Sequence, residues 1–163
     1  MLDVIDKVNN LRQFKRSFIL SPEKWRGFTM DNLEWNQTKF QTNNSEQIPQ
    51  SKGIYCFVIK HDNPCFPSHG YITYIGKTGD GNERTLRDRY KDYIREKRRP
   101  KRVHIYELLN QWEEDLYFQY WEAGDDIDLG EVETNLLDCI IPPLNRKDFT
   151  GDFGKIVREA FAQ

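Results

Sequence analysis

The runs GIYCFVIK at residues 53–60 and GYITYIGK at residues 70–77 decide how the centre of this chain folds. Both are rich in β-branched and aromatic residues and have the length of a strand. The segment between them, HDNPCFPSHG, holds two prolines and a glycine, which are turn-forming residues. We therefore predict two antiparallel strands joined as a hairpin with a long loop.

The segments after the hairpin predict helices and a third strand. Within residues 84–98, Leu86, Tyr90 and Tyr93 lie at i, i+4 and i+7 and form an apolar stripe typical of a helix, which Pro100 ends. Further along, the patterns predict a helix at 103–112, a strand at 116–123, an apolar-faced helix capped by Asp128 that stops at Pro142-Pro143, and a short helix within the tail 149–161.

The first fifty residues give weaker signals. Residues 2–14 carry apolar side chains at roughly helical spacing and predict a short helix. Pro22 and Gly27 are expected to break any regular element around them. The other expectations here are extended pieces at 18–20 and 33–40 and a polar loop at 41–53.

The order of these elements predicts an α+β fold. The predicted order is two hairpin strands, two helices, a strand and a helix. This order is typical of a small three-stranded antiparallel sheet flanked by helices. We expect one domain at 51–163, with residues 1–50 as an N-terminal extension that packs on this core.

Composition excludes several classes of protein. With 37% hydrophobic and 31% charged residues over 163 positions, the chain is expected to fold into a core and not to be disordered. No apolar run approaches the roughly 20 residues of a membrane helix, and the first residues lack the pattern of a signal peptide. We expect a cytoplasmic protein without a membrane partner.

The cysteines predict neither a disulfide framework nor a zinc site. There are three, an odd number without CxxC spacing. Cys56, His61, Cys65 and His69 supply zinc-ligand types, but their spacing matches no common zinc pattern, and Cys56 lies inside an apolar strand. Buried thiols and loop histidines are the favoured interpretation.

Charge is strongly segregated although the net charge is only −2. Residues 84–102 hold ten Lys or Arg against three acids, whereas residues 113–133 hold nine acids and no Lys or Arg. A basic patch is typical of nucleic-acid binding, although such runs also occur on solvated helix faces. The acidic stretch could instead be a protein-docking or autoinhibitory surface. The residues predicted to contact a nucleic-acid backbone are Arg84, Arg87, Arg95, Lys97, Arg98, Arg99, Lys101 and Arg102.

The two tripeptides Gly53-Ile54-Tyr55 and Tyr74-Ile75-Gly76 lie on the two predicted hairpin strands, where the sequence resembles the GIY-YIG nuclease family. Further positions match that family's pattern in the expected order. They are Lys77 directly after the second tripeptide, Arg89 and Tyr93 four residues apart on the next helix, and Glu133 followed by Asn145 after twelve residues. The hairpin loop and the stretch between Lys77 and Arg89 are longer than usual, which leaves the choice of arginine open to Arg84 or Arg87.

The resemblance implies a site that hydrolyses phosphodiesters with one divalent metal. A hard cation such as Mg²⁺ (or Mn²⁺) prefers oxygen ligands and keeps several waters, so Glu133 is the candidate ligand. Arg89 offers a planar fork of donors for the phosphate, with Tyr93 one turn away. The resemblance implies a tyrosine general base, for which Tyr55 is favoured, with Tyr74 orienting water or phosphate. Lys77 or the metal would lower the phenol pKa. Asn145 is expected to fix local backbone or an active-site neighbour.

The predicted function is a stand-alone, metal-dependent endonuclease that cuts double-stranded DNA. Restriction or phage defence is the leading biological role, with a homodimer as an open alternative for cutting both strands. The competing hypothesis is a catalytically inactive nucleic-acid-binding or regulatory protein on the same fold.

Overall fold

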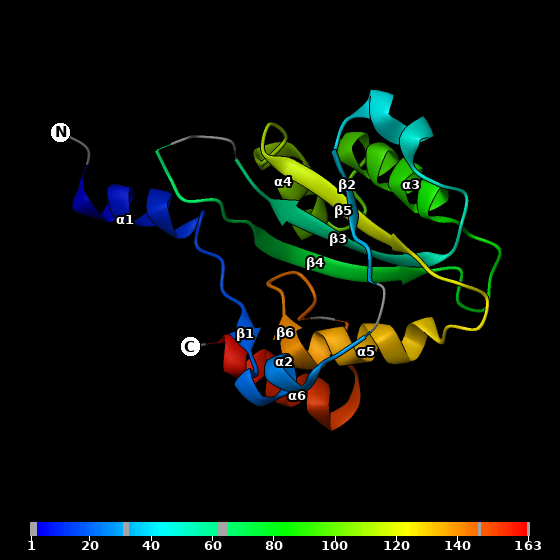
Figure 1. Ribbon diagram of the computed structural model, residues 1–163. Coiled ribbons are helices and arrows are strands. Elements are labelled where there is room, and N and C mark those ends of the chain that lie inside the picture. Colours follow the sequence, from blue (N-terminus) through cyan, green and yellow to red (C-terminus); the bar gives the residue numbers. More distant parts are fainter. Residues whose placement is uncertain (1–2, 31–32, 62–64, 147, 163) are drawn as a thin grey trace.

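The computed structural model describes residues 3–30, 33–61, 65–146 and 148–162 (Figure 1). The strands are β1 Ile19–Leu20, β2 Asn36–Lys39, β3 Gly53–Ile59, β4 Tyr71–Thr78, β5 Leu116–Glu122 and β6 Ile140–Ile141, and the helices are α1 Val4–Arg12, α2 Pro22–Gly27, α3 Leu86–Arg98, α4 Val103–Gln111, α5 Leu129–Cys139 and α6 Gly151–Phe161, with a 3₁₀ helix at Thr42–Gln47. Within the described residues, the main sheet has the antiparallel order β2-β5-β3-β4, and a small second sheet pairs β1 with β6.

The α+β class is confirmed, but the prediction of three strands is wrong because the main sheet has four. The additional strand, β2, pairs with β5 from Asn36↔Tyr120 to Lys39↔Tyr117. Its sequence NQTK shows no apolar alternation, since an edge strand is held by backbone hydrogen bonds on one side and is largely solvated. The extended piece predicted at 33–40 contains β2, but hydrophobic patterning gave no indication that this piece joins the main sheet.

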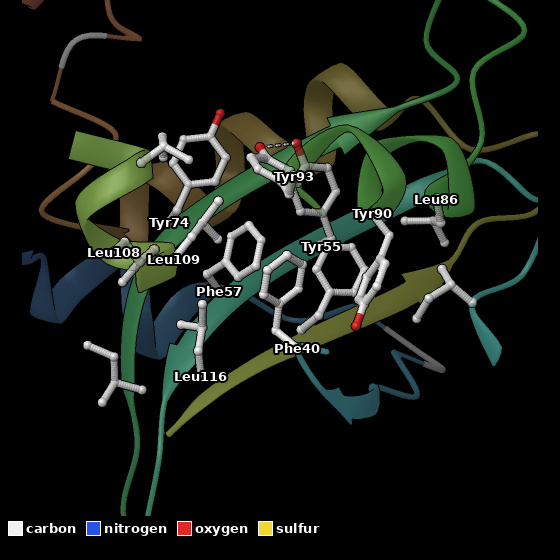
Figure 2. Close-up of a cluster of buried hydrophobic side chains, with 14 residues drawn as sticks. Phe40, Tyr55, Phe57, Tyr74, Leu86, Tyr90, Tyr93, Leu108, Leu109 and Leu116 are labelled. Atoms are coloured by element: carbon white, nitrogen blue, oxygen red, sulfur yellow. Dashed lines mark hydrogen bonds between the residues drawn. The ribbon is translucent and has the colours of Figure 1, made fainter. Parts of the chain in front are cut away.

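Helices cover both faces of the main sheet (Figure 1). Helices α3 and α4 lie over one face and α5 over the other, so every residue of β3 is buried. Alternate β3 side chains enter two different cores. Tyr55 and Phe57 pack in an aromatic cluster under α3 (Figure 2). Ile54 and Cys56 pack towards α5. The hairpin prediction is confirmed, including its antiparallel register.

Two short segments differ from their predicted conformation. Residues 22–27, expected to be irregular, form helix α2. Pro22 occupies the first turn, where the missing N–H would have had no helical partner, so this proline starts the helix instead of breaking it. Helix α5 ends at Cys139, three residues before Pro142, because residues 140–141 extend to pair with β1.

The first fifty residues contribute to the main sheet and its core. Phe40 and Ile48 are buried at 1% and 0% exposure within the aromatic cluster, next to β2. In contrast, every residue of α1 is exposed, and this helix extends from the body of the molecule (Figure 1). The domain boundary at residue 50 stays a prediction.

None of the helices in the described ranges is both long and apolar enough to cross a membrane.

Candidate active site at the edge of the main sheet

Tyr55 lies at the centre of the candidate site. It is 0% exposed on β3, and its hydroxyl is 3.0 Å from the Tyr93 hydroxyl, as the dashed line in Figure 2 shows. The Tyr55 hydroxyl also accepts a hydrogen bond from Arg89 Nη2 at 3.2 Å. Gly76 is paired with Tyr55 across the hairpin, and a Cβ at this glycine would lie 2.6 Å from the phenol oxygen. The second tripeptide therefore makes room for the tyrosine of the first.

Tyr74 lies on the edge strand β4 and reaches a different group of side chains. Its register partner on β3 is Phe57, so Tyr74 is a diagonal neighbour of Tyr55 and not directly opposite it. The two phenol ring centroids are 6.3 Å apart. Tyr74 also lines a pocket of about 340 Å³ together with Glu133 and Asp148. It thus connects the Tyr55 group with the carboxylates near α5.

Helix α3 brings Arg89 to the Tyr55 hydroxyl. Thr85 and Asp88 form a capping box that fixes where the helix begins. Four residues separate Arg89 from Tyr93, and the guanidinium carbon lies 5.9 Å from the Tyr93 ring centroid. Arg89 Nε is buried and has no hydrogen-bond partner among the described residues. Leaving a buried hydrogen-bond donor without a partner costs free energy. The Arg89 Nε–H is therefore suited to donate to an acceptor atom of a ligand.

Both rival arginines form ion pairs, and neither contacts the Tyr55 hydroxyl among the bonds of the described residues. Arg84 forms an ion pair with Asp92 on α3. Arg87 donates to the backbone carbonyl of Ile48 at 2.6 Å and forms an ion pair of 3.2 Å with Glu46. Arg87 therefore fastens the 3₁₀ segment to α3 and lies away from the Tyr55 hydroxyl. Of these arginines, Arg89 has the geometry expected of a phosphate ligand.

Glu133 lies near the start of α5, which Asp128 caps with bonds to the backbone N–H of Gly130 and Glu131. Its side chain is 23% exposed and lies 3.6 Å from Lys77 Nζ, which also contacts Asp80 at 2.6 Å. Burial raises the pKa of Glu133, and the Lys77 charge opposes that increase. The structure thus directs Lys77 towards carboxylates, whereas we had expected it to act on a phenol.

Asn145 holds the backbone of β4 in place. Its amide oxygen accepts from Ile75 N at 2.8 Å, and its Nδ2 donates to Ile75 O at 2.7 Å. The same Nδ2 donates to Asp148 at 2.7 Å. Asn145 is 1% exposed, and these bonds fix both the strand between Tyr74 and Gly76 and the neighbouring carboxylate.

A basic cleft of about 820 Å³ opens beside Arg89. Seven of its lining residues are cationic and two are acidic. Lys97 is outside this lining and forms an ion pair with Glu113. The lining residues are Arg84, Arg89, Asp92, Arg95, Glu96, Arg98, Arg99, Lys101 and Arg102. The structure therefore gathers most of the predicted nucleic-acid contacts in one place and leaves Arg87 and Lys97 outside it.

Both site phenols are neutral at physiological pH in the free protein. Burial raises the pKa of Tyr55 well above its usual value of about 10, and the Tyr93 and Tyr74 phenols add to that increase. Burial likewise raises the pKa of Tyr74. The Arg89 charge lowers both pKa values, but burial outweighs it.

The donors near Tyr74 fit a cation that keeps most of its own water. Among the described residues, no group of three or more His, Cys, Asp or Glu could enclose a metal ion. Glu133 and Asp148 line the pocket beside Tyr74 and together offer carboxylate oxygens, which Mg²⁺ accepts while retaining waters.

Sequence reasoning missed two residues of this site. Asp148 follows Asn145 by three residues in a turn, and burial raises the pKa of its carboxyl. Arg102 was assigned only to backbone contacts, yet its guanidinium carbon lies 5.3 Å from the Tyr93 ring centroid. A polar residue shortly after the asparagine was the available signal for Asp148. Nothing in the basic run distinguished Arg102 from its neighbours.

Comparison with protein-family models, with curated proteins and with solved structures finds no match to this chain. The resemblance to GIY-YIG nucleases stays a prediction that depends on the quoted residues.

Proposed function

We propose that this chain is a metal-dependent endonuclease that hydrolyses phosphodiester bonds in DNA, on a site resembling that of GIY-YIG nucleases. The observation that supports this most is the position of Arg89. Its guanidinium bonds the Tyr55 hydroxyl and lines the 820 Å³ cleft, and its Nε is buried without a partner among the described residues. Such a guanidinium suits a phosphate held at the inner end of a polyanion-binding cleft.

The cleft supports a nucleic acid as the substrate. Seven cationic side chains outnumber the two acids, so the lining retains positive charge after Asp92 pairs with Arg84 and Arg95. Positive side chains that follow a phosphate backbone give affinity without reading sequence. We propose duplex DNA as the partner, with restriction or phage defence as the biological role and a homodimer to cut both strands.

Hydrolysis requires a water to attack the phosphorus while one ester P–O bond breaks. Arg89 would neutralise the charge that develops on the non-bridging oxygens. Tyr55 is the proposed proton acceptor, held in place by Tyr93. Because burial raises its pKa, only a small fraction of Tyr55 is deprotonated at neutral pH, so this chemistry becomes faster in alkali.

Glu133 and Asp148 are the residues that would hold the divalent cation beside Tyr74. When bound there, Mg²⁺ or Mn²⁺ supplies positive charge that polarises the phosphate and lowers the pKa of bound water. The chain itself keeps these carboxylates in position through the α5 cap at Asp128 and through Asn145.

The alternative function is a nucleic-acid-binding protein without catalysis. Two observations favour it. The Lys77 ammonium already lies 3.6 Å from Glu133, where it competes with a cation. The buried phenols also hold their protons at neutral pH. Such a protein would use the same basic cleft and would cut no DNA.

The test is incubation of supercoiled plasmid with Mg²⁺ or Mn²⁺ across a range of pH. We expect nicked and linear products from the parent protein. Glu133→Gln should abolish them, and Glu131→Gln should not, because Glu131 is exposed on another face of the same helix. Plasmid that stays intact with the parent under every metal, while it is retarded on a gel, would establish the binding protein instead.

A further inference from the structure

Glu96 is a buried acid in the wall of the basic cleft. It is 6% exposed on the fourth turn of α3. A carboxylate this buried is costly unless it is fully paired. Arg102 provides the pairing through its backbone N–H at 3.0 Å, its Nε at 3.1 Å and its Nη2 at 2.7 Å. Both carboxylate oxygens are engaged, so the Arg102 fork is fixed in one orientation.

The fixed orientation places Arg102 against the proposed site. Its guanidinium carbon is 5.3 Å from the Tyr93 ring centroid, and that of Arg89 is 5.9 Å from the same centroid. Two guanidinium groups thus lie close to the phenol ring that bonds Tyr55. The charges of both arginines also act on Tyr74, since each lowers the pKa of that phenol.

The other cationic residues of the same run differ in their surroundings. Arg98, Arg99 and Lys101 line the same cleft but are exposed, whereas Arg102 is partly buried. Exposed side chains of this kind give salt-dependent, position-tolerant contacts with a backbone. A guanidinium fixed by a buried acid retains its position relative to Arg89 when a phosphate arrives.

We propose that Arg102 is a second phosphate-binding guanidinium at the reaction centre and that Glu96 is its positioning residue. This inference rests on the proposed function, since it names a further catalytic residue of that site. Arg102 binds a non-bridging oxygen of the phosphodiester that Arg89 holds, and it forms or breaks no covalent bond. Arg102 lines the cleft that the substrate would enter, and Glu96 accepts only from Nε and Nη2 of its guanidinium.

Steady-state kinetics of the Arg102→Ala and Arg98→Ala variants distinguish a contact at the reaction centre from a contact with the nucleic-acid backbone. Each variant removes one arginine from the same cleft. We expect Arg102→Ala to lower kcat by about a hundredfold, as the loss of a transition-state donor does. Arg98→Ala should raise KM a few-fold, with kcat nearly unchanged, and this effect should fade in high salt. Arg102→Lys keeps the charge but not the fork and should recover only part of kcat.

Glu96→Gln tests the positioning role. It should lower kcat by about tenfold without raising KM, and in the double variant with Arg102→Ala it should add nothing further, because both changes remove one function. Thermal melting of each variant reports folding. Equal kcat in Arg102→Ala and Arg98→Ala, with folded protein in both, would overturn the proposal.

Binding of pyrophosphate, measured by calorimetry, gives a readout that needs no cutting. Arg102→Ala should weaken it by about tenfold, and Arg98→Ala by less than about threefold. If the parent cuts no DNA but Arg102→Ala still weakens pyrophosphate binding more than Arg98→Ala does, the nuclease proposal fails. The inference that Arg102 binds phosphate is then still supported. If the parent cuts DNA and the two variants bind pyrophosphate alike, the inference about Arg102 fails alone.

Discussion

Tyr74 lies between two halves of the candidate site, a guanidinium half (Tyr55, Arg89, Tyr93) and a carboxylate half (Lys77, Glu133, Asp148). In the guanidinium half, Tyr55 and Tyr93 are 0% and 1% exposed and bond one another, and Tyr55 also accepts a hydrogen bond from Arg89. In the carboxylate half, Lys77 and Glu133 side chains are 30% and 23% exposed and lie 3.6 Å apart. Core packing therefore fixes the positions of the side chains in the guanidinium half. In the carboxylate half, these positions depend on charge interactions that solvent screens.

This difference teaches which part of the site depends on its ligand. A phosphate bound in the guanidinium half would meet phenols whose positions are fixed by the aromatic cluster around them (Figure 2). A divalent cation at Glu133 would instead have to displace the Lys77 ammonium. We therefore expect variants in the guanidinium half to affect geometry and rate, and variants in the carboxylate half to affect cation affinity first.

The largest expected effect concerns the proton acceptor in the guanidinium half. Burial raises the Tyr55 pKa above 10, so below that pH the reactive phenolate increases about tenfold with each pH unit. With saturating metal and DNA, kcat should rise from pH 7 to pH 10 without a plateau. Tyr55→Phe should lower kcat by about a thousandfold and remove this slope.

A plateau of kcat below pH 9 in the parent would show that another group accepts the proton. The base would then belong to the carboxylate half or to cation-bound water, and the division of roles between the two halves would be wrong. Tyr71→Phe is the control, since this tyrosine is 55% exposed on β4, belongs to neither half and should leave the profile unchanged.

Metal titration of Arg89→Ala and Glu133→Asp should then distinguish the halves directly. Both variants should be about a hundredfold slower at 1 mM Mg²⁺, a concentration of the order at which such sites fill. Raising the metal concentration should restore part of the Glu133→Asp activity, because a shortened carboxylate mainly weakens cation binding. It should not restore Arg89→Ala. Equal recovery of both would mean that the two halves are not distinct.

The fold near these residues was predictable where the spacing of hydrophobic residues and the turn-forming residues indicate the same element. The hairpin at 53–60 and 70–77 and helix α3 follow from such patterns. The extended piece predicted at 33–40 contains β2, but its pairing with β5 was not predictable, because this pairing uses backbone groups that every residue carries. Helix α2 was not predicted because a proline breaks a helix in its interior but is favoured in its first turn. The sequence alone did not show that Pro22 lies in the first turn.

The site was predictable residue by residue only where a motif named the residue. The resemblance pointed to Arg89, but its contact with Tyr55 depends on how α3 packs over β3. Arg102 differs from Arg98 in its bonds to Glu96 and its contact with the Tyr93 ring, and both depend on how the turn between α3 and α4 places it. Asp148 reaches the pocket through a turn that Asn145 anchors to β4. Such placements arise from tertiary packing and leave no periodic signal.

A smaller effect is expected from Gly76→Ala, which tests how closely the guanidinium half is packed. The new Cβ would lie 2.6 Å from the Tyr55 hydroxyl, so the phenol must shift and its bond to Tyr93 must lengthen. We expect a loss of about 1–3 kcal/mol in the free energy of unfolding, measured in urea. Gly124→Ala, where nothing lies within 4 Å of an added Cβ, should change it by less than about 0.5 kcal/mol. Equal losses would show that the first half is loosely packed.

The smallest expected effect belongs to Lys77→Met and concerns the carboxylate half alone. Removing the ammonium frees Glu133 from a partner that a cation must displace, and a partly exposed pair of this kind is worth about 0.2–1 kcal/mol. The affinity for Mn²⁺, measured by calorimetry without DNA, should therefore rise by about two- to fivefold. Lys60→Met, whose ammonium lies over the Tyr117 ring, should leave this affinity unchanged. Weaker Mn²⁺ binding in Lys77→Met would mean that the ammonium orients Glu133 for the cation, and the carboxylate half would then be as preformed as the other.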